Sequence, residues 1–188
     1  MANKGTSQEE RRGSSFLDVL VTVVIAVVVA VILRVFVIGV YVVPTGSMLD
    51  TIQEGDMLVG EKVSLKFSSP SRGDVVTFDS PLEPGTTLIK RVIACGGQTI
   101  DLIDGRVYVD GVALDEPYTE GKTTSSLSDI QGSAGITYPY TVPEGYVFAM
   151  GDNRTNSLDS RYFGPVSLDA VSSKGLFIYW PLTDLKLL

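Results

Sequence analysis

The chain has 188 residues, of which 44% are hydrophobic and 20% charged, so it is long enough for about one domain with a packed core, and wholesale disorder is not expected. Its formal net charge of −7 argues against nucleic-acid binding, which needs a basic face. It has no histidine and a single cysteine, which excludes an internal disulfide, Ser-His-Asp or Cys-His catalysis and an HExxH zinc site.

Residues 16–36 form the first predicted element, a transmembrane helix. The stretch is almost wholly apolar and carries no charge between Val19 and Leu33. A spanning helix needs about 20 residues, and 16–36 reaches this length if Asp18 and Arg34 lie among the headgroups on opposite sides. A cleaved signal peptide would end at a small-residue site of the A-x-A type, which residues 38–43 (IGVYVV) lack. We therefore favour a retained anchor over a signal peptide or a buried core helix.

The charges before this helix predict its orientation. Lys4, Arg11 and Arg12 precede it, and basic residues mark the cytoplasmic side of a membrane. We expect residues 1–15 to be a cytoplasmic tail and residues 37–188 to be an extracytoplasmic domain. That domain carries an excess of acidic residues, so any further membrane contact should be apolar.

Many short β-type runs follow, broken by Gly, Pro, Asp and Asn, and they predict a mainly β fold. Asp104-Gly105 is typical of a two-residue hairpin turn, whereas residues 119–137, rich in Thr, Ser and Gly, predict an exposed loop. No amphipathic helix is expected after the anchor. The runs cover residues 37–43, 57–63, 74–78, 88–94, 99–102, 106–109, 146–150 and 175–179.

Two segments could supply a nucleophile and its base. In residues 44–48 (PTGSM), Gly46 permits close backbone approach and Ser47 could be a nucleophile on a tight turn, although such a segment is more often a plain turn. A serine nucleophile needs a base, and burial of Lys90 on a predicted strand (residues 86–94, TTLIKRVIA) would favour its neutral form. Alternatively, Lys90 reaches solvent from a strand edge and Arg91 is a surface charge.

A third segment, residues 150–164 (MGDNRTNSLDSRYFG), is dense in hydrogen-bonding side chains. Its simplest interpretation is a polar loop closed by Asp–Arg pairs. A functional interpretation lets one of its hydroxyls orient the lysine while the ion pairs hold the loop.

Together these segments resemble the bacterial type I signal peptidases, the Ser-Lys leader peptidases. PTGSM resembles the nucleophile box, residues 72–78 (RGDVVTF) the β box, residues 89–93 (IKRVI) the lysine box and residues 151–161 (GDNRTNSLDSR) the C-terminal box. The resemblance covers about residues 16–180. It implies a mostly β catalytic domain with a smaller β insertion, which we place at about residues 101–143, on the outer face of a bacterial cytoplasmic membrane.

The resemblance also implies a function: a membrane-bound serine endopeptidase that removes signal peptides from exported preproteins after small residues. It implies no cofactor and no metal, and as partners signal peptides, membrane lipid and the nearby secretion translocon. The implied site residues are Ser47 as nucleophile, Lys90 as general base, Thr45 with the Ser47 N–H as oxyanion hole, Met48 as a substrate contact, Ser157 to orient Lys90, and Arg91, Asp152, Asp159 and Arg161 as structural support.

The chain departs from the family pattern beside these residues. Residues 49–51 (LDT) replace the usual Pro-Thr, and residues 94–98 (ACGGQ) replace the usual GLPGD, which bears on turn geometry and substrate preference. Cys95 without a histidine partner is interpreted as a buried small hydrophobe. The competing functions are another Ser-Lys peptidase, such as a self-cleaving repressor, and a catalytically silent anchored β domain that binds partners.

Overall fold

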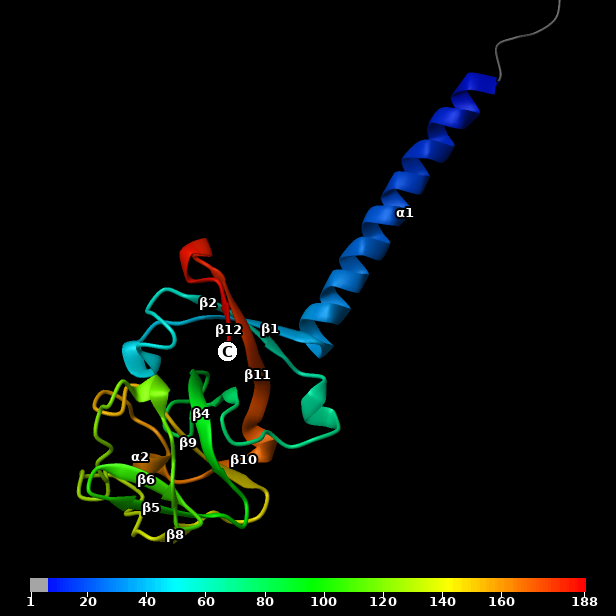
Figure 1. Ribbon diagram of the computed structural model, residues 1–188. Coiled ribbons are helices and arrows are strands. Elements are labelled where there is room, and N and C mark those ends of the chain that lie inside the picture. Colours follow the sequence, from blue (N-terminus) through cyan, green and yellow to red (C-terminus); the bar gives the residue numbers. More distant parts are fainter. Residues whose placement is uncertain (1–6) are drawn as a thin grey trace, which may run out of the picture. The chain divides into compact units, whose positions relative to one another are not determined.

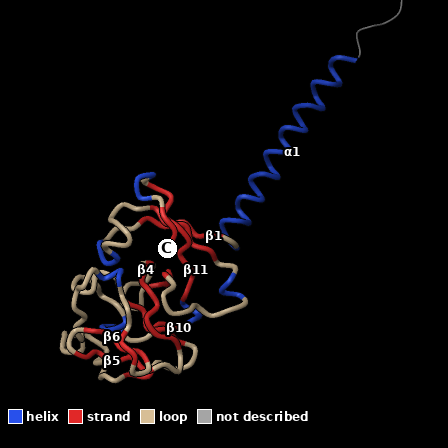
Figure 2. The backbone as a smooth tube through the Cα atoms, in the orientation of Figure 1, coloured by secondary structure: helices blue, strands red, loops and turns tan. Residues whose placement is uncertain are grey.

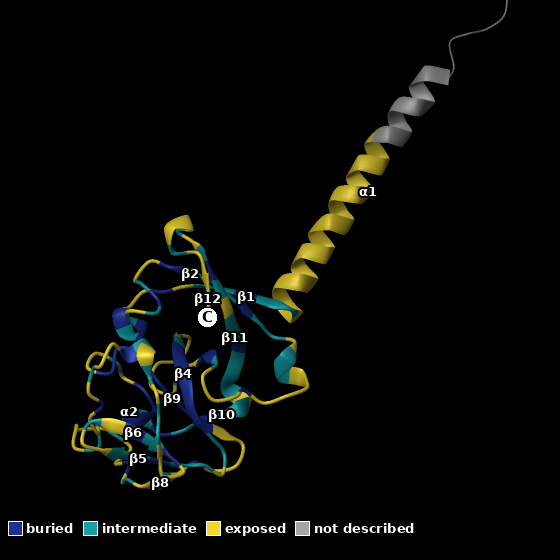
Figure 3. Ribbon diagram, in the orientation of Figure 1, coloured by how far each residue is buried: buried dark blue, intermediate teal, exposed yellow. Residues whose placement is uncertain are grey.

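The computed structural model describes residues 7–188, with side-chain environments from residue 16 onward. Helix α1 (Ser7–Phe36) is the longest element (Figure 1). Its residues 16–36 have a mean hydropathy of 3.1 and are exposed throughout, so the helix is long and apolar enough to cross a membrane (Figure 3). A Val-rich segment that is apolar on all sides suits lipid, where a helix satisfies its own backbone. The helix begins before the predicted span, and part of the predicted tail, including Lys4, lies outside the described residues.

Residues Ile38–Leu188 form one compact unit built from two antiparallel sheets (Figures 1 and 2). The larger sheet has the strand order β1-β2-β11-β3-β4-β9-β10, and β12 pairs with β11. Strand β4 lies inside this sheet, between β3 and β9. Its strands are β1 (Ile38–Val42), β2 (Met57–Glu61), β3 (Val75–Asp79), β4 (Thr87–Cys95), β9 (Tyr146–Met150), β10 (Val166–Ser167), β11 (Val171–Trp180) and β12 (Lys186–Leu187).

The smaller sheet has the order β7-β6-β5-β8. Its hairpin β5–β6 turns at Asp104-Gly105, where φ is 50° and 79°, as a two-residue turn with both residues in the left-handed region requires. The insertion that we placed at residues 101–143 covers most of this sheet. Its strands are β5 (Thr99–Ile103), β6 (Arg106–Val109), β7 (Val112–Ala113) and β8 (Tyr140–Thr141).

Buried side chains join the two sheets. One apolar cluster packs Ile93 and Phe148 of the larger sheet against Ile100 and Val107 of the smaller one. A second cluster, which includes Met48 and Ile89, lies under the segment that follows β1. A third packs β3, β4 and β9 against the segment around β10. Strand β4 is therefore covered on both faces, and residues 89–94 are all buried (Figure 3).

The mainly β class is confirmed, and a strand lies at each of the eight predicted runs. The two-residue strands β7, β8, β10 and β12 are too short to produce a periodic pattern. In the predicted loop at residues 119–137, Thr119 ends a 3₁₀ turn and the rest contains no helix or strand. Thr119, Thr124 and Ile136 are buried, which corrects the prediction of an exposed segment. The one-turn helix α2 (Ser160–Phe163) was not predicted; Asp159 caps it by accepting from Arg161 N.

Candidate active site

Ser47 lies on a single 3₁₀ turn (Gly46–Met48) that follows β1. Leu49 N–H closes this turn by donating to Gly46 O. Met48 is 1% exposed and anchors the turn in the second cluster, whereas Ser47 stays partly exposed. Asn153 fixes the turn from the other side, because its Nδ2 donates to Gly46 O (2.9 Å) and its N–H donates to Ser47 O (3.1 Å). The backbone around the hydroxyl is thus held in place from both directions.

Lys90 extends from β4 toward this turn. Its Nζ lies 2.7 Å from Ser47 Oγ and 3.0 Å from Ile89 O. The residue is 2% exposed, so the ammonium does not reach solvent from a strand edge, and that alternative is wrong. A serine hydroxyl and an amine at hydrogen-bond distance are the arrangement required for a nucleophile and its base.

Burial changes the proton affinity of this amine. It lowers the pKa of Lys90 from 10.5 to about 8; Asp159 and Asp152 oppose this effect, and Arg161 adds to it. Desolvation dominates because the charged form loses its water and gains no direct carboxylate partner. With a pKa of about 8, roughly a tenth of Lys90 is neutral at pH 7, against far less than a hundredth for a free lysine.

Two arginines neutralise the nearby carboxylates. Arg91 donates from Nε (2.8 Å) and Nη2 (2.6 Å) to the two oxygens of Asp152. Arg161 makes the same paired contact with Asp159, at 2.9 and 2.8 Å. All four residues are buried, so Arg91 is not a surface charge. Removing one partner from such a pair leaves an uncompensated buried charge, which is strongly destabilising.

The segment after β9 brings these groups together around Gly151. Gly151 N–H donates to Asp159 (3.0 Å), and a Cβ at this position would overlap Ser157 Oγ and Ser47 O. Only glycine therefore lets the segment approach the serine turn so closely. Gly151 and Asn153 were part of the C-terminal box but had no predicted role; a Gly-Asp-Asn run directly after a buried strand was the only signal for them.

A pocket of about 70 Å³ adjoins the serine and the lysine. Thr45 is exposed and lines this pocket. Met48 also lines it, but its side chain is almost fully buried. The pocket is lined by Val43, Pro44, Thr45, Ser47, Met48, Thr86, Thr87, Leu88, Ile89 and Lys90.

Ser157 does not make its expected hydrogen bond to Lys90. Its Oγ is buried and has no hydrogen-bond partner among the described residues. The hydroxyl lies beside Gly151, while the Lys90 amine is directed to Ser47 Oγ and Ile89 O. The lysine is therefore oriented by its strand and by Ser47 in this structure.

The surroundings of Cys95 disfavour a cysteine nucleophile. Cys95 lies at the end of β4, half-buried, in another pocket with Pro70 and Gly96, and burial raises the pKa of its thiol, which disfavours the reactive thiolate. Within residues 16–188, no group of three or more Cys, Asp or Glu side chains is placed to hold a metal ion.

Several known proteins are similar to this chain in sequence. The sequence profile of the family described as "Signal peptidase, peptidase S26" matches residues 16–180. The probable signal peptidase I-1 of Synechocystis sp. is 38% identical over 156 residues, covering 79% of this chain and 74% of that protein. Signal peptidase I of Bacillus caldolyticus is 33% identical over 186 residues, covering 94% and 95%. The crystal structure of a signal peptidase I from Enterococcus faecalis V583 has 32% identity and a TM-score of 0.48, covering 57% of this chain and 97% of that one.

Proposed function

This chain belongs to the signal peptidase family, peptidase S26, and we propose that it cleaves signal peptides from exported preproteins with Ser47 as nucleophile and Lys90 as general base. The observation that carries the proposal is the 2.7 Å separation of Ser47 Oγ and a buried Lys90 Nζ. The chain has no histidine, so the base must be another group, and the Lys90 amine is within hydrogen-bond distance of the serine hydroxyl.

The proposed reaction proceeds in two steps. Neutral Lys90 accepts the Ser47 hydroxyl proton while Oγ attacks the scissile carbonyl carbon, and the C–N bond of the tetrahedral intermediate then breaks as Lys90 returns the proton to the leaving amine. This releases the mature protein and leaves the signal peptide as an ester on Ser47. Neutral Lys90 next deprotonates a water that attacks the ester, and it then reprotonates Ser47 as the signal peptide leaves with a free carboxylate.

We propose that Thr45 and the Ser47 N–H stabilise the oxyanion. Thr45 is exposed and lines the pocket, two residues before the nucleophile. A donor fixed in advance where charge develops lowers the barrier without reorganisation, and losing one such donor typically costs about 2.7–4 kcal/mol. Arg91, Asp152, Asp159 and Arg161 act as structural support, as described above.

The size of the pocket supports cleavage after small residues. We propose that this pocket of about 70 Å³ takes the small side chain before the cut and that a large side chain would clash there. Met48, which is almost fully buried, is part of the pocket lining. We propose that the substrate binds as an extended segment whose backbone pairs with an exposed strand edge.

Membrane attachment would bring enzyme and substrate together. We propose that residues 16–36 span a bacterial cytoplasmic membrane with residues 1–15 in the cytoplasm, and that residues 37–188 act outside, near lipid and the secretion translocon. The signal peptide is itself a membrane segment, so anchoring confines both partners to one surface and raises their effective concentration.

Cleavage of a preprotein tests the proposal. The full-length protein is reconstituted in lipid vesicles with a preprotein that carries an Ala-X-Ala site, and products are identified by mass. We expect one cut directly after the second alanine, lost in Ser47→Ala and when that alanine is changed to leucine. Ser126→Ala, which changes a serine of the exposed loop, is the matched control and should cleave normally. Wild-type protein that folds but leaves the preprotein intact would favour the silent binding domain.

A further inference from the structure

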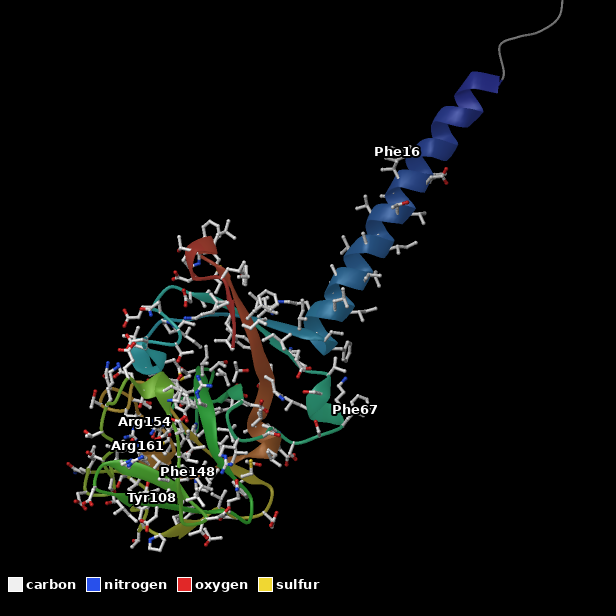
Figure 4. All side chains as sticks on the ribbon, in the orientation of Figure 1. Phe16, Phe67, Tyr108, Phe148, Arg154 and Arg161 are labelled. Carbon is white, nitrogen blue, oxygen red and sulfur yellow. The ribbon has the colours of Figure 1, made fainter. Side chains whose placement is uncertain are left out.

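A segment of the proposed insertion contacts several charged side chains that lie outside the insertion. This clamp segment (residues 116–125) lies between β7 and β8 and contains no strand. Its contacts reach four charged side chains outside the proposed insertion, and Arg154 and Arg161, which Figure 4 labels, are two of them. The contacts are Tyr118 with Arg91, Glu116 and Thr124 with Arg154, Ser125 O with Arg161, and Lys122 with Asp50.

Tyr118 contacts Arg91, the residue that directly follows the proposed base on β4. The Arg91 guanidinium carbon lies 4.2 Å from the centre of the Tyr118 ring, and that of Arg154 lies 5.9 Å from it. The Tyr118 hydroxyl donates to Glu116 (3.1 Å), which in turn pairs with Arg154 at 2.6 Å. The ring is thus held by the clamp segment and covers one face of Arg91, where a cation and an aromatic face attract each other.

The position of Arg91 matters to Lys90 through Asp152. Arg91 immediately follows Lys90 on β4 and pairs with both oxygens of Asp152. Asp152 is one of the two carboxylates whose charge favours the protonated form of Lys90. A guanidinium that leaves Asp152 for solvent would leave this charge uncompensated beside the amine, and water entering in its place would also stabilise the ammonium.

We propose that Tyr118 is a positioning residue for the Ser-Lys reaction: its ring shields the Arg91–Asp152 ion pair from water and so keeps Lys90 available as a neutral base. The proposal rests on the proposed role of Lys90. It gives the proposed insertion a part in catalysis, although no clamp residue touches Ser47 or Lys90 through a hydrogen bond.

The pH dependence of kcat/KM tests this role. In the reconstituted full-length protein, the rising limb of wild type should lie near pH 8. Tyr118→Leu keeps apolar volume but removes the ring, and we expect its limb to move up by roughly half a unit to one unit. This gives a three- to tenfold loss of kcat/KM at pH 7 that disappears above pH 10. Tyr118→Phe keeps the ring and should retain the wild-type limb.

Matched variants separate the possible outcomes. Tyr108→Leu removes a tyrosine of strand β6 in the smaller sheet, opposite Asp101 and Ala113, and should leave the limb unchanged. A Tyr118→Leu limb that stays at the wild-type pH, or an equal shift in Tyr118→Phe, overturns the proposal. Melting curves check folding, and Tyr118→Met replaces the leucine variant if that one unfolds. Ser47→Ala and Lys90→Met are measured in the same assay, and if either still cleaves, the proposed function fails. If both are inactive and the Tyr118→Leu limb does not move, only the positioning role is refuted.

Discussion

The substitution Lys90→Met should increase the stability of the folded protein at neutral pH while it abolishes cleavage. Methionine keeps the apolar stem of Lys90 but removes the amine that burial disfavours in its charged form. The pKa of Lys90 is about 8 in the folded chain and 10.5 in the absence of burial. At 1.36 kcal/mol for each pKa unit, wild type lacks about 3 kcal/mol of stability below pH 8.

The sign and the pH window follow from the lowered pKa. Between pH 8 and pH 10.5 the unfolded chain binds a proton that the folded chain has lost, so wild-type stability rises with pH through this window. Losing the two Lys90 hydrogen bonds, to Ser47 Oγ and Ile89 O, offsets about 1 kcal/mol each. The variant should therefore be about 1 kcal/mol more stable than wild type at pH 7, and about 1 to 2 kcal/mol less stable near pH 10.5.

Urea unfolding in mild detergent, followed by the fluorescence of the single tryptophan, Trp180, measures this difference at both pH values. Exposed Lys186 supplies the matched control, because Lys186→Met makes the same change of side chain outside the buried site. A Lys90→Met effect that does not vary with pH would refute the reasoning, since it would mean that Lys90 is not desolvated.

Three further substitutions test the surroundings of the serine. Gly151→Ala would place a methyl group against Ser47 O and Ser157 Oγ, so kcat should fall about 10²-fold through the displaced nucleophile while KM changes less, as steady-state kinetics can check. Thr45→Val keeps the shape of an exposed residue but removes a hydroxyl, and kcat should fall by about 10²- to 10³-fold without a change in melting temperature; near-normal turnover removes Thr45 from the oxyanion hole. Cys95→Ala should retain full cleavage, because this thiol lies in another pocket, and a thiol reagent should inhibit wild type no more than the variant. A large loss of kcat in Cys95→Ala would contradict that placement.

Local sequence patterns predict much of this fold. Short β-type runs broken by Gly, Pro, Asp and Asn mark the strands, and Asp104-Gly105 marks a hairpin because both residues tolerate a positive φ. These local patterns do not predict the order of the strands in the sheet. The pairing of β11 with both β2 and β3, for example, joins the end of the chain to segments about 100 residues earlier. Such pairings depend on which buried faces fit together in three dimensions.

In the candidate site, too, some residues have a local sequence signal and others are placed only by the tertiary structure. The boxes around Ser47 and Lys90 have a recognisable residue pattern, whereas the burial of Arg91 becomes clear only once both faces of β4 are covered. Tyr118 carries no local signal at all, because its contact with Arg91 depends on the path of a loop. The expected Ser157–Lys90 hydrogen bond is absent, and the Ser157 hydroxyl lies beside Gly151 without a hydrogen-bond partner among the described residues. Sequence therefore identifies reacting groups more readily than the groups that position them.

The central claim is that buried Lys90 is the base for Ser47. The most direct measurement is kcat/KM for an Ala-X-Ala peptide from pH 6 to pH 11, with full-length wild type, Ser47→Ala and Lys90→Met in lipid vesicles. The account predicts a wild-type rate that rises with a pKa of about 8, and background cleavage by both variants at every pH. A Lys90→Met variant that still cleaves with the same rising limb would contradict the account, because the base would then be another group.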